Sequence, residues 1–431
     1  MKKTFAAIAI SIPVILAGFL VRMQSLAHQE LSPPECRVEK WDIPTSFFNS
    51  QNQDASIQKS KVPPSAVLIQ RLPVTCCQGD ASCVDEFIYA KENNQLPDKK
   101  ALLIAIDHSL QYLQTANAVA AYQRDQVTGI TRDRVLNSLK RFRELLVKTN
   151  SATELHTAIE REFVFYQSVG HDTKGAVLFT AYYEPLYAAS RFPTAEYRYP
   201  IYRLPADLDS WPKPHPTRQE LEGADGLQGE KGNLRGLELF WFRDRLEPYL
   251  AQIQGSARIQ LTDGTQTTIG YAGNTAYTYK SIGRELANDG KLPLEGMTMP
   301  IILDYFQKYP QDLNIYIPRD RSFVFFQENH GNPAQGSINV PVTAERSIAT
   351  DKSLMPPGAL ALIRASFPFA NATGIEHRIV SRYVLDQDTG GAIKGAGRVD
   401  YFLGTGKVAG DRAGVTVSNG QLFYLLLKPK N

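Results

Sequence analysis

The 431-residue sequence has few of the residues that hold metal ions, with seven histidines and four cysteines. The histidines are scattered and include no His-x-x-x-His pair, the spacing with which one face of a helix binds zinc. The sequence also shows no glycine-rich loop of the kind that cradles phosphates, and no internal repeat. These absences argue against metal-dependent hydrolysis, and we expect neither a metal ion nor a cofactor.

An excess of charge of one sign is also missing. Cleavage after residue 27 would remove Lys2, Lys3 and Arg22 from the 47 basic residues, and the remaining 44 would equal the 44 acidic residues. A neutral chain gives no reason to expect nucleic acid as a partner. Hydrophobic residues make up 43% and charged residues 21%, which is typical of a soluble globular protein. With roughly 150 residues per domain, we expect two domains and an N-terminal appendage.

The N-terminus carries the features of an export signal. Met1-Lys2-Lys3 precedes an uncharged run from Thr4 to Val21, and Ser25-Leu26-Ala27 supplies small residues where a signal peptidase cuts. The run of about 18 residues is also long enough to span a bilayer, so residues 4–21 could instead remain as a membrane anchor. We therefore expect an exported protein of the periplasm or cell envelope, with residues 1–27 as signal peptide or anchor.

All four cysteines precede residue 90, at Cys36, Cys76, Cys77 and Cys83. An even number of cysteines in an exported chain favours disulfides, and their irregular spacing disfavours zinc, the alternative. They lie within residues 28–98, which are rich in Pro, Ser and Gln and show little periodicity. This region is predicted to be an extended arm that the disulfides staple.

Hydrophobic periodicity predicts helices after the arm and again in the middle of the chain. The predicted helices are 101–122, 133–146, 152–166, 237–250, 279–288 and 300–309. Short runs of β-branched and aromatic residues between turn residues predict strands. These are 176–183, 199–204, 257–261, 266–271, 322–326, 359–363, 378–385, 399–403 and 421–427, with a hairpin turn at 262–264. Strands on both sides of a mixed middle section suggest a barrel interrupted by an inserted domain.

The densest polar cluster runs from Asp386 to Gly395 and continues from Arg398 to Asp400. Two glycines after Asp388-Thr389 let the backbone pass close to another group, and a carboxylate on the following strand could face the same cleft. This arrangement suits an aspartate that acts as a catalytic acid. Asp388 and Asp400 could equally be turn residues that bind loop amides, and spacing alone does not decide between the two interpretations.

A resemblance to a known family favours the interpretation that these aspartates include a catalytic acid. The segments Asp388 to Gly395 and Arg398 to Asp400, with Ser347 to Asp351 and Pro356-Pro357-Gly358 upstream, resemble the three-aspartate barrel module of the membrane-bound lytic murein transglycosylase A family. Further motifs resemble that family in its order, at Phe179 to Pro185, Tyr199 to Pro205, Gln254 to Ala257, Tyr271 to Asn274, Tyr279 to Arg284, Ser322 to Phe326 and Gly410 to Gly414. The resemblance extends over residues 101–428.

The resemblance implies a mainly β fold with N-terminal helices. Its core would be a double-psi β-barrel, interrupted by a smaller inserted β-domain, with a groove between them. We place the barrel and its helical part at 99–205 and 315–431, and the inserted domain at 206–314. Two departures stand out: Glu184-Pro185 replaces a Thr-Pro that many members have, and Leu31 to Cys36 lacks the small residues needed for lipid attachment.

The implied activity is that of a lytic transglycosylase, endo- or exo-acting, which cleaves the MurNAc-GlcNAc β-1,4 bond of peptidoglycan and leaves 1,6-anhydromuramic ends. The family's catalytic aspartate matches Asp400, and the other two match Asp388 and Asp351, which we assign to shaping the groove and the loop. One carboxyl group suffices because the sugar's own 6-hydroxyl is the nucleophile, whereas hydrolysis needs two. Asp400 must start protonated, so we expect a partly desolvated groove to raise its pKa.

The matching motifs also imply residues that contact the glycan strand, the expected partner: Tyr182, Tyr183, Gln254, Gly255, Asn274 and Lys394. The tyrosines would stack on sugar faces and the amide side chains would bind N-acetyl groups, although a strand tyrosine is more often a core residue. Lys394, Arg284 and Arg398 would bind stem-peptide carboxylates or serve as structural charges. We expect a monomer.

Two other functions compete with this one. Asp388-Thr389-Gly390 is the tripeptide of aspartic proteases, but those enzymes need two such motifs and the sequence has one. A noncatalytic peptidoglycan-binding barrel protein is the stronger alternative, because fold does not determine function. The presence of Asp400 within its whole motif argues for the enzyme.

Overall fold

The computed structural model describes residues 67–71, 84–90, 98–124 and 129–429. The predicted signal peptide or anchor, 1–27, and the four cysteines therefore lie outside the described residues, as does most of the 28–98 arm. Two short parts of that arm are described, the strand β1 (Leu68–Arg71) and the 3-10 turn η3 (Glu86–Ile88). Both belong to the main fold, since β1 pairs with β2 and the turn follows the buried Asp85.

Helices form in the predicted N-terminal region. They are α2 (Asp98–Tyr112), α3 (Ala116–Tyr122), α4 (Arg132–Lys148) and α5 (Ala152–Glu162). The helix predicted over 101–122 is two helices, α2 and α3, because a new helix begins after Thr115. Thr115, Thr131 and Ser151 begin three of these helices by accepting a backbone N–H in the first turn. The predicted third helix is too long, because residues from Phe163 onward form a strand, β2 (Phe163–Ser168).

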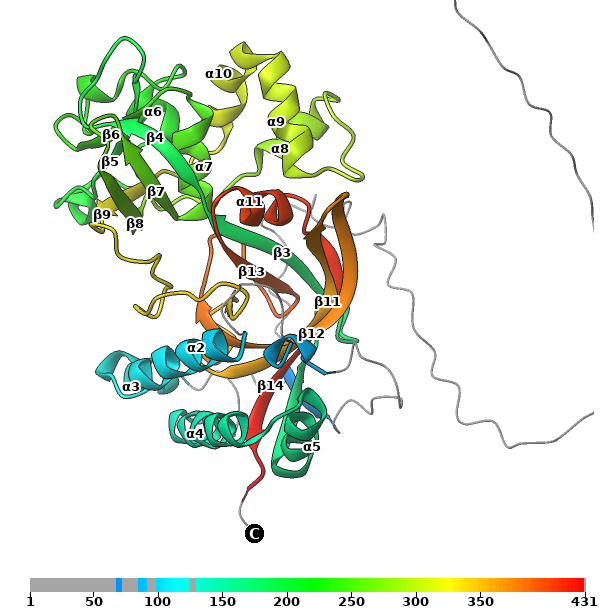
Figure 1. The fold of residues 1–431 in the computed structure, drawn as a ribbon. Coiled ribbons are helices and arrows are strands. Elements are labelled where there is room, and N and C mark those ends of the chain that lie inside the picture. The colour runs from blue at the N-terminus through cyan, green and yellow to red at the C-terminus, as the bar shows by residue number, and fades with distance from the viewer. Residues whose placement is uncertain (1–66, 72–83, 91–97, 125–128, 430–431) are drawn as a thin grey trace, which may run out of the picture. The chain divides into compact units, whose positions relative to one another are not determined.

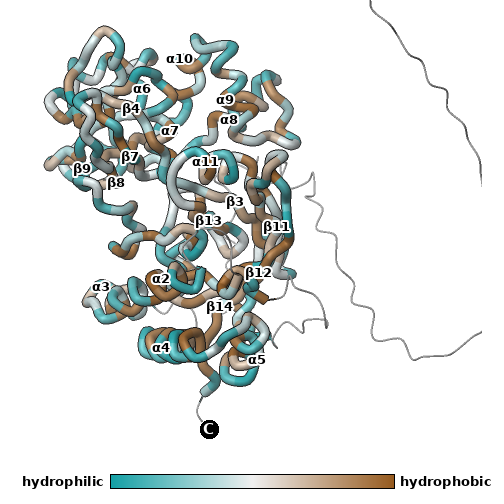
Figure 2. The backbone as a smooth tube through the Cα atoms, in the orientation of Figure 1, coloured by the Kyte–Doolittle hydropathy of each residue, from teal (hydrophilic) through white to brown (hydrophobic). Residues whose placement is uncertain are grey.

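Six strands close into a barrel (Figure 1). They are β3 (Val177–Glu184), β10 (Ser347–Ala349), β11 (Leu360–Asn371), β12 (Gly374–Asp388), β13 (Arg398–Thr405) and β14 (Ser418–Leu427). Their order is β14-β11-β12-β10-β13-β3, and β3 pairs again with β14. The pairs β10 with β12 and β13 with β3 are parallel. β2 and β1 extend the sheet beyond β14. Figure 2 shows hydrophobic residues concentrated along these strands, where the main core lies.

A second sheet lies in the sequence between β3 and β10. Its strands, in the order β5-β6-β4-β7-β8-β9, are β4 (Leu186–Ser190), β5 (Tyr199–Tyr202), β6 (Glu238–Phe242), β7 (Ser256–Leu261), β8 (Gln266–Asn274) and β9 (Val324–Glu328). The same stretch contains the helices α6 (Arg218–Glu222), α7 (Leu246–Gln254), α8 (Ile282–Asn288), α9 (Met299–Lys308) and α10 (Leu313–Tyr316). Its 3-10 turns are η4 (Leu208–Ser210), η5 (Gly229–Lys231), η6 (Pro310–Asp312) and η7 (Ile317–Arg319). The predicted fold class, a barrel interrupted by a second β-structure, is confirmed.

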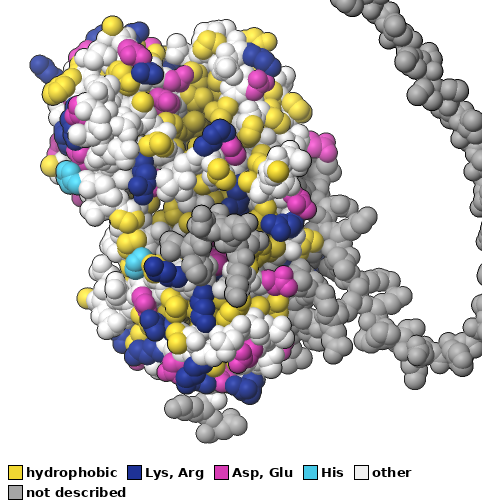
Figure 3. Space-filling model, viewed as in Figure 1, with side chains coloured by type: hydrophobic (Ala, Val, Ile, Leu, Met, Phe, Trp, Pro, Cys, Tyr) yellow, Lys and Arg dark blue, Asp and Glu magenta, His cyan; other side chains and the backbone are white. Residues whose placement is uncertain are grey.

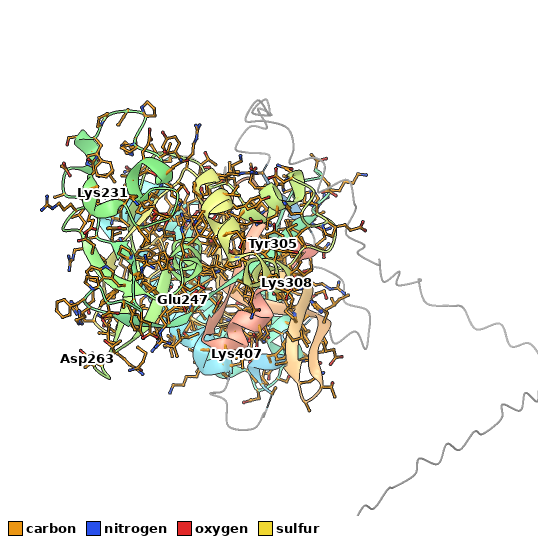
Figure 4. All side chains as sticks on the ribbon, turned by 90° about the horizontal axis from the view of Figure 1, so that it is seen from above. Lys231, Glu247, Asp263, Tyr305, Lys308 and Lys407 are labelled. Atoms are coloured by element: carbon orange, nitrogen blue, oxygen red, sulfur yellow. The ribbon has the colours of Figure 1, made fainter. Side chains whose placement is uncertain are left out.

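The hairpin turn at 262–264 is confirmed as well. β7 and β8 pair antiparallel on either side of it, and Gly264 has a φ of 85°. Glycine adopts this left-handed conformation without steric cost. Figure 4 labels Asp263 at this turn.

Further predictions differ from the structure. The second sheet begins at β4 and ends at β9, so its strands extend beyond the predicted range 206–314 on both sides. The predicted helix 237–250 is wrong: its first half is β6, which pairs with β4 and β5, and α7 begins at Leu246. The helix α11 (Lys407–Ala413) lies between the predicted strands 399–403 and 421–427, where no helix is predicted. Strand pairing is a tertiary property, and a short apolar run does not reveal which sheet it joins.

Among the described residues, no helix combines the length and apolar character needed to cross a membrane. On the face that Figure 3 shows, acidic and basic side chains are interspersed.

Candidate active site

Two of the three aspartates lie in one row across four neighbouring barrel strands. Ala349 on β10 is paired with Asp388 on β12 and with Asp400 on β13, and Asp400 is paired with Thr180 on β3. Paired residues on adjacent strands project from the same face of a sheet. The short side chain of Ala349 therefore separates the two carboxyl groups.

This row faces away from the main core. Val399 and Tyr401, on either side of Asp400, are buried in that core. Because side chains alternate along a strand, Asp400 projects from the opposite face of β13. The same face carries Tyr182 and Phe402, whose rings are 5.1 Å apart.

Asp400 is half-buried, and its carboxyl group has an asymmetric environment. The Thr180 hydroxyl donates a 2.7 Å hydrogen bond to Oδ1, while Oδ2 has no hydrogen-bond partner among the described residues. Burial raises the pKa of Asp400, and the negative charge of Asp388 raises it further. The hydrogen bond from Thr180 and the positive charge of Arg398 act in the opposite direction but do not outweigh burial. Asp400 therefore keeps its proton up to a higher pH than an ordinary aspartate does.

Asp388 differs from Asp400 in its hydrogen bonds. Its Oδ1 accepts from the backbone N–H groups of Ser337 (2.9 Å) and Thr389 (2.8 Å), and its Oδ2 accepts from the Tyr182 hydroxyl (2.8 Å). Burial raises the pKa of Asp388, although these three donors lower it. Both oxygens are occupied as acceptors, so Asp388 is a fixed carboxylate that is poorly placed to donate a proton.

Asp351 holds the loop between β12 and β13. Its Oδ2 accepts a 2.8 Å hydrogen bond from the backbone of Gly395, and Oδ1 accepts from the Ser353 hydroxyl at 2.6 Å. Burial would raise the pKa of Asp351, but these hydrogen bonds and the charge of the exposed Lys394 outweigh burial and lower it. Asp351 is therefore an ionised anchor for the loop.

Sequence reasoning missed the buried ion pair beneath this row. Asp386 is fully buried and accepts hydrogen bonds from Thr350 (2.8 Å) and Tyr424 (2.7 Å), and Lys352 binds both Asp386 and the main-chain oxygen of Asp388. The signal was present in the run Asp386-Gln387-Asp388. A bulge there places both aspartates opposite consecutive residues of β10 and turns Gln387 away toward α2.

The predicted glycan-contacting residues fall into separate groups. Tyr182 bonds to Asp388, whereas the backbone N–H of Tyr183 donates to Gln254 Oε1 at 3.0 Å. Gly255 ends α7 in the left-handed conformation, with a φ of 78°. The exposed Asn274 bonds to Tyr271 and Thr275, and no contact of Asn274 with the aspartate row is recorded in the described part of the chain.

The segment that contains Arg284 approaches the loop between β12 and β13. A Cβ atom on Gly391 would lie 3.9 Å from Tyr279 Cβ, five residues before Arg284. Burial lowers the pKa of Arg284. Burial also lowers the pKa of Arg398, although the negative charge of Asp400 acts in the opposite direction. Arg398 donates to Thr180 at 3.3 Å, which gives it a contact within the site. No group of three or more His, Cys, Asp or Glu side chains within the described ranges could hold a metal ion.

The residue that departs from the resemblance, Glu184, is buried at the end of β3. It accepts hydrogen bonds from Arg258 on β7 (2.7 Å) and from Thr405 on β13 (2.8 Å). Glu184 therefore connects the barrel with the second sheet at the point where the chain passes from one to the other.

Two family models match different parts of the chain. The model of the MltA specific insert domain matches residues 178–327, and that of the 3D domain matches residues 346–426. The membrane-bound lytic murein transglycosylase A of Escherichia coli (strain K12) is 31% identical over 267 residues, which are 61% of this chain and 69% of that protein. The chain belongs to the membrane-bound lytic murein transglycosylase A family.

Solved structures of lytic murein transglycosylases share the fold. The membrane-bound lytic murein transglycosylase of Agrobacterium tumefaciens aligns with a TM-score of 0.59 at 26% identity, covering 77% of this chain and 93% of its own. The Escherichia coli family member with bound chitohexaose aligns with a TM-score of 0.60 at 24% identity, covering 82% of this chain and 98% of its own.

Proposed function

We propose that this protein is a lytic transglycosylase that acts on murein, cleaves the MurNAc-GlcNAc β-1,4 bond and leaves 1,6-anhydromuramic ends. Asp400 is the single general acid and base. The observation that carries this proposal is the environment of Asp400, which is half-buried with a raised pKa and has one oxygen, Oδ2, without a hydrogen-bond partner among the described residues. Membership of the transglycosylase A family supports the substrate class.

The reaction needs one proton-carrying group. Protonated Asp400 gives its proton to the bridging oxygen as the bond from C1 of the muramic sugar to that oxygen breaks. The 6-hydroxyl oxygen of the same sugar then bonds to C1, and Asp400 takes the hydroxyl proton and returns to its starting state. No water is consumed, so the products are an anhydro end and a free 4-hydroxyl group.

The neighbouring groups support this acid. Three donors bind the carboxylate of Asp388 and favour its ionised form, and its negative charge favours the protonated form of Asp400. The same charge would stabilise positive charge that develops on the sugar ring. Asp351 would shape the loop, and Tyr182, Tyr183, Gln254, Gly255, Asn274 and Lys394 would line the glycan groove. The proposed location is the cell envelope, reached through residues 1–27.

Digestion of purified peptidoglycan in water enriched in oxygen-18 tests the reaction type. A transglycosylase releases muropeptides with anhydro ends that carry no oxygen-18, whereas a hydrolase releases reducing ends that carry the label. Mass spectrometry distinguishes the two products. Labelled reducing ends would contradict the proposed reaction. Binding to murein without any released product would favour the noncatalytic alternative.

A further inference from the structure

Three side chains from two neighbouring parallel strands form a chain of hydrogen bonds. The Thr180 hydroxyl on β3 is 2.7 Å from Asp400 Oδ1 on β13, its partner in register. Arg398 precedes Asp400 by two residues and so lies on the same face, with Nη2 3.3 Å from Thr180 Oγ1. Arg398 Nη1 is buried and has no hydrogen-bond partner among the described residues. Leaving this buried donor unpaired has a free-energy cost, so the hydrogen bond from Nη2 to Thr180 is the contact that holds the guanidinium in the site.

The donors and acceptors in this chain have fixed directions. Arginine only donates hydrogen bonds, so Thr180 Oγ1 accepts from Arg398. The hydroxyl has one hydrogen, which then points to Asp400 Oδ1. Oδ1 is therefore the accepting oxygen of the carboxyl group, and a proton on Asp400 belongs on Oδ2.

We propose that Thr180, oriented by Arg398, is a positioning residue that fixes the catalytic proton on Oδ2 of Asp400. This inference rests on the proposed role of Asp400. Oδ2 gives its proton to the bridging oxygen and later takes the proton of the sugar's 6-hydroxyl. Without the Thr180 hydroxyl the carboxyl group can rotate and the proton can occupy either oxygen, so fewer complexes start in the reactive geometry.

Three charged or titratable groups face Asp400 and also influence its protonation. Arg398 lies on its own strand, Asp388 projects from β12 across Ala349, and Tyr182 lies on β3. Thr180 carries no charge, so its removal leaves these three groups in place. Loss of its hydroxyl removes one interaction that lowers the pKa of Asp400.

The test compares Thr180→Val, which keeps the branched shape without the hydroxyl, with Thr180→Ser, which keeps the hydroxyl. We expect kcat for anhydro-product release to fall about 10- to 100-fold in Thr180→Val. Binding to murein should stay within about twofold of the wild type, because Thr180 acts on the acid and not on substrate affinity. The basic limb of the pH profile should move to higher pH. Thr180→Ser should keep activity within about threefold.

Thr267→Val is the matched control. Thr267 is a buried strand threonine in the second sheet, and its hydroxyl also donates to a carboxylate, Glu328, at 2.7 Å. This variant should leave kcat and the pH profile unchanged. Glu247 on α7, labelled in Figure 4, has its pKa raised to about 7 by burial, so Glu247→Gln is included to separate its titration from that of Asp400.

Wild-type kcat and an unshifted pH profile in Thr180→Val would overturn the proposal. Equal damage in Thr180→Val and Thr180→Ser would also overturn it, since packing alone would then explain the loss. The pKa of Asp400, read from the infrared difference between each protein and its Asp400→Asn variant, must rise in Thr180→Val whether or not kcat can be measured. A wild-type protein that releases no anhydro product refutes the role of Asp400 itself, and this inference falls with it.

Discussion

Asp400, Asp388 and Asp351 have the same side chain but three different surroundings. Asp400 accepts one hydrogen bond, Asp388 accepts three, and Asp351 accepts hydrogen bonds on both oxygens beside Lys394. The resemblance pointed to these aspartates from their motifs. It assigned no role to Thr180, although Thr180 stands two residues before Tyr182 on one strand and so shares its face. The order of donors around a carboxyl group depends on pairing between distant strands, which sequence spacing does not contain.

The raised pKa of Asp400 predicts a cost in stability at neutral pH. The pKa of Asp400 is higher in the folded state than in the unfolded state, so protonation of Asp400 stabilises the fold. This stabilisation is fully present at a pH below the unfolded-state pKa, and it is lost as the pH rises through the folded-state pKa. We therefore expect Asp400→Asn to have a higher Tm than the wild type near neutral pH, with a difference that shrinks as pH falls toward about 4. Thermal unfolding followed from about pH 4 to about pH 8 measures this difference.

Asp351→Asn should behave in the opposite way. Its folded pKa is lowered, so its contribution to stability is present above the unfolded value and is lost as pH falls through the folded pKa. The variant should melt below the wild type near neutral pH, and the two should converge in acid. The same sign of change in both variants would contradict the assigned environments.

At the scale of elements, the loop between β12 and β13 sets where Asp400 lies. The loop is held by Asp351 at Gly395 and ends at Gly397, whose Cβ position would be 2.4 Å from the backbone nitrogen of His171. Only glycine allows this close approach of two backbones. The start of β13, and with it the register of Asp400 against Thr180, depends on this contact.

Gly397→Ala is therefore expected to destabilise the protein by about 1–3 kcal/mol, because the backbone of His171 must move. Gly391→Ala is the matched variant in the same loop, where the new methyl group would meet Tyr279 Cβ at an ordinary 3.9 Å. Chemical denaturation of both variants measures the two costs. Equal stability of the two would show that the contact at His171 does not hold β13.

The sequence predicts helices and turns correctly where neighbouring residues alone determine them. The hairpin at 262–264 formed because Asp-Gly suits its turn, and α4 began after Thr131 because that hydroxyl caps it. The helix predicted over 237–250 failed because residues 238–242 find two strand partners from outside the segment. Tertiary pairing there overrides the local pattern.

At the scale of the whole molecule, the segment 84–90 joins the N-terminal part of the described chain to the C-terminal half of the barrel. Asp85 is fully buried, and its carboxylate lies 2.5 Å from Arg346 Nη1 and accepts the backbone N–H of Tyr383 at 2.8 Å. Arg382 lies 3.5 Å from the same carboxylate. Residues 28–98 show little periodicity, so their pattern does not predict this contact.

Asp85→Ala should cost about 3–5 kcal/mol of unfolding free energy, since it leaves two buried arginines with less opposing charge. Asp107→Ala is the control, because Asp107 forms an Asp–Arg pair of 2.7 Å with Arg143 in which both side chains are substantially exposed. We expect that pair to contribute less than about 1 kcal/mol. Urea denaturation compares the two, and a similar small loss in both would contradict a stabilising role for Asp85.

The proposed activity depends on Asp400 as the acid, and its most direct test is the release of anhydro muropeptides by the wild type, Asp400→Asn and Asp411→Asn. Asp411 is an exposed α11 residue paired with Lys407, so its variant controls for loss of one carboxylate. The proposed role of Asp400 predicts a loss of at least about 1,000-fold in Asp400→Asn, with folding retained, and near wild-type release in Asp411→Asn. Anhydro products released by folded Asp400→Asn at a rate close to that of the wild type would contradict it.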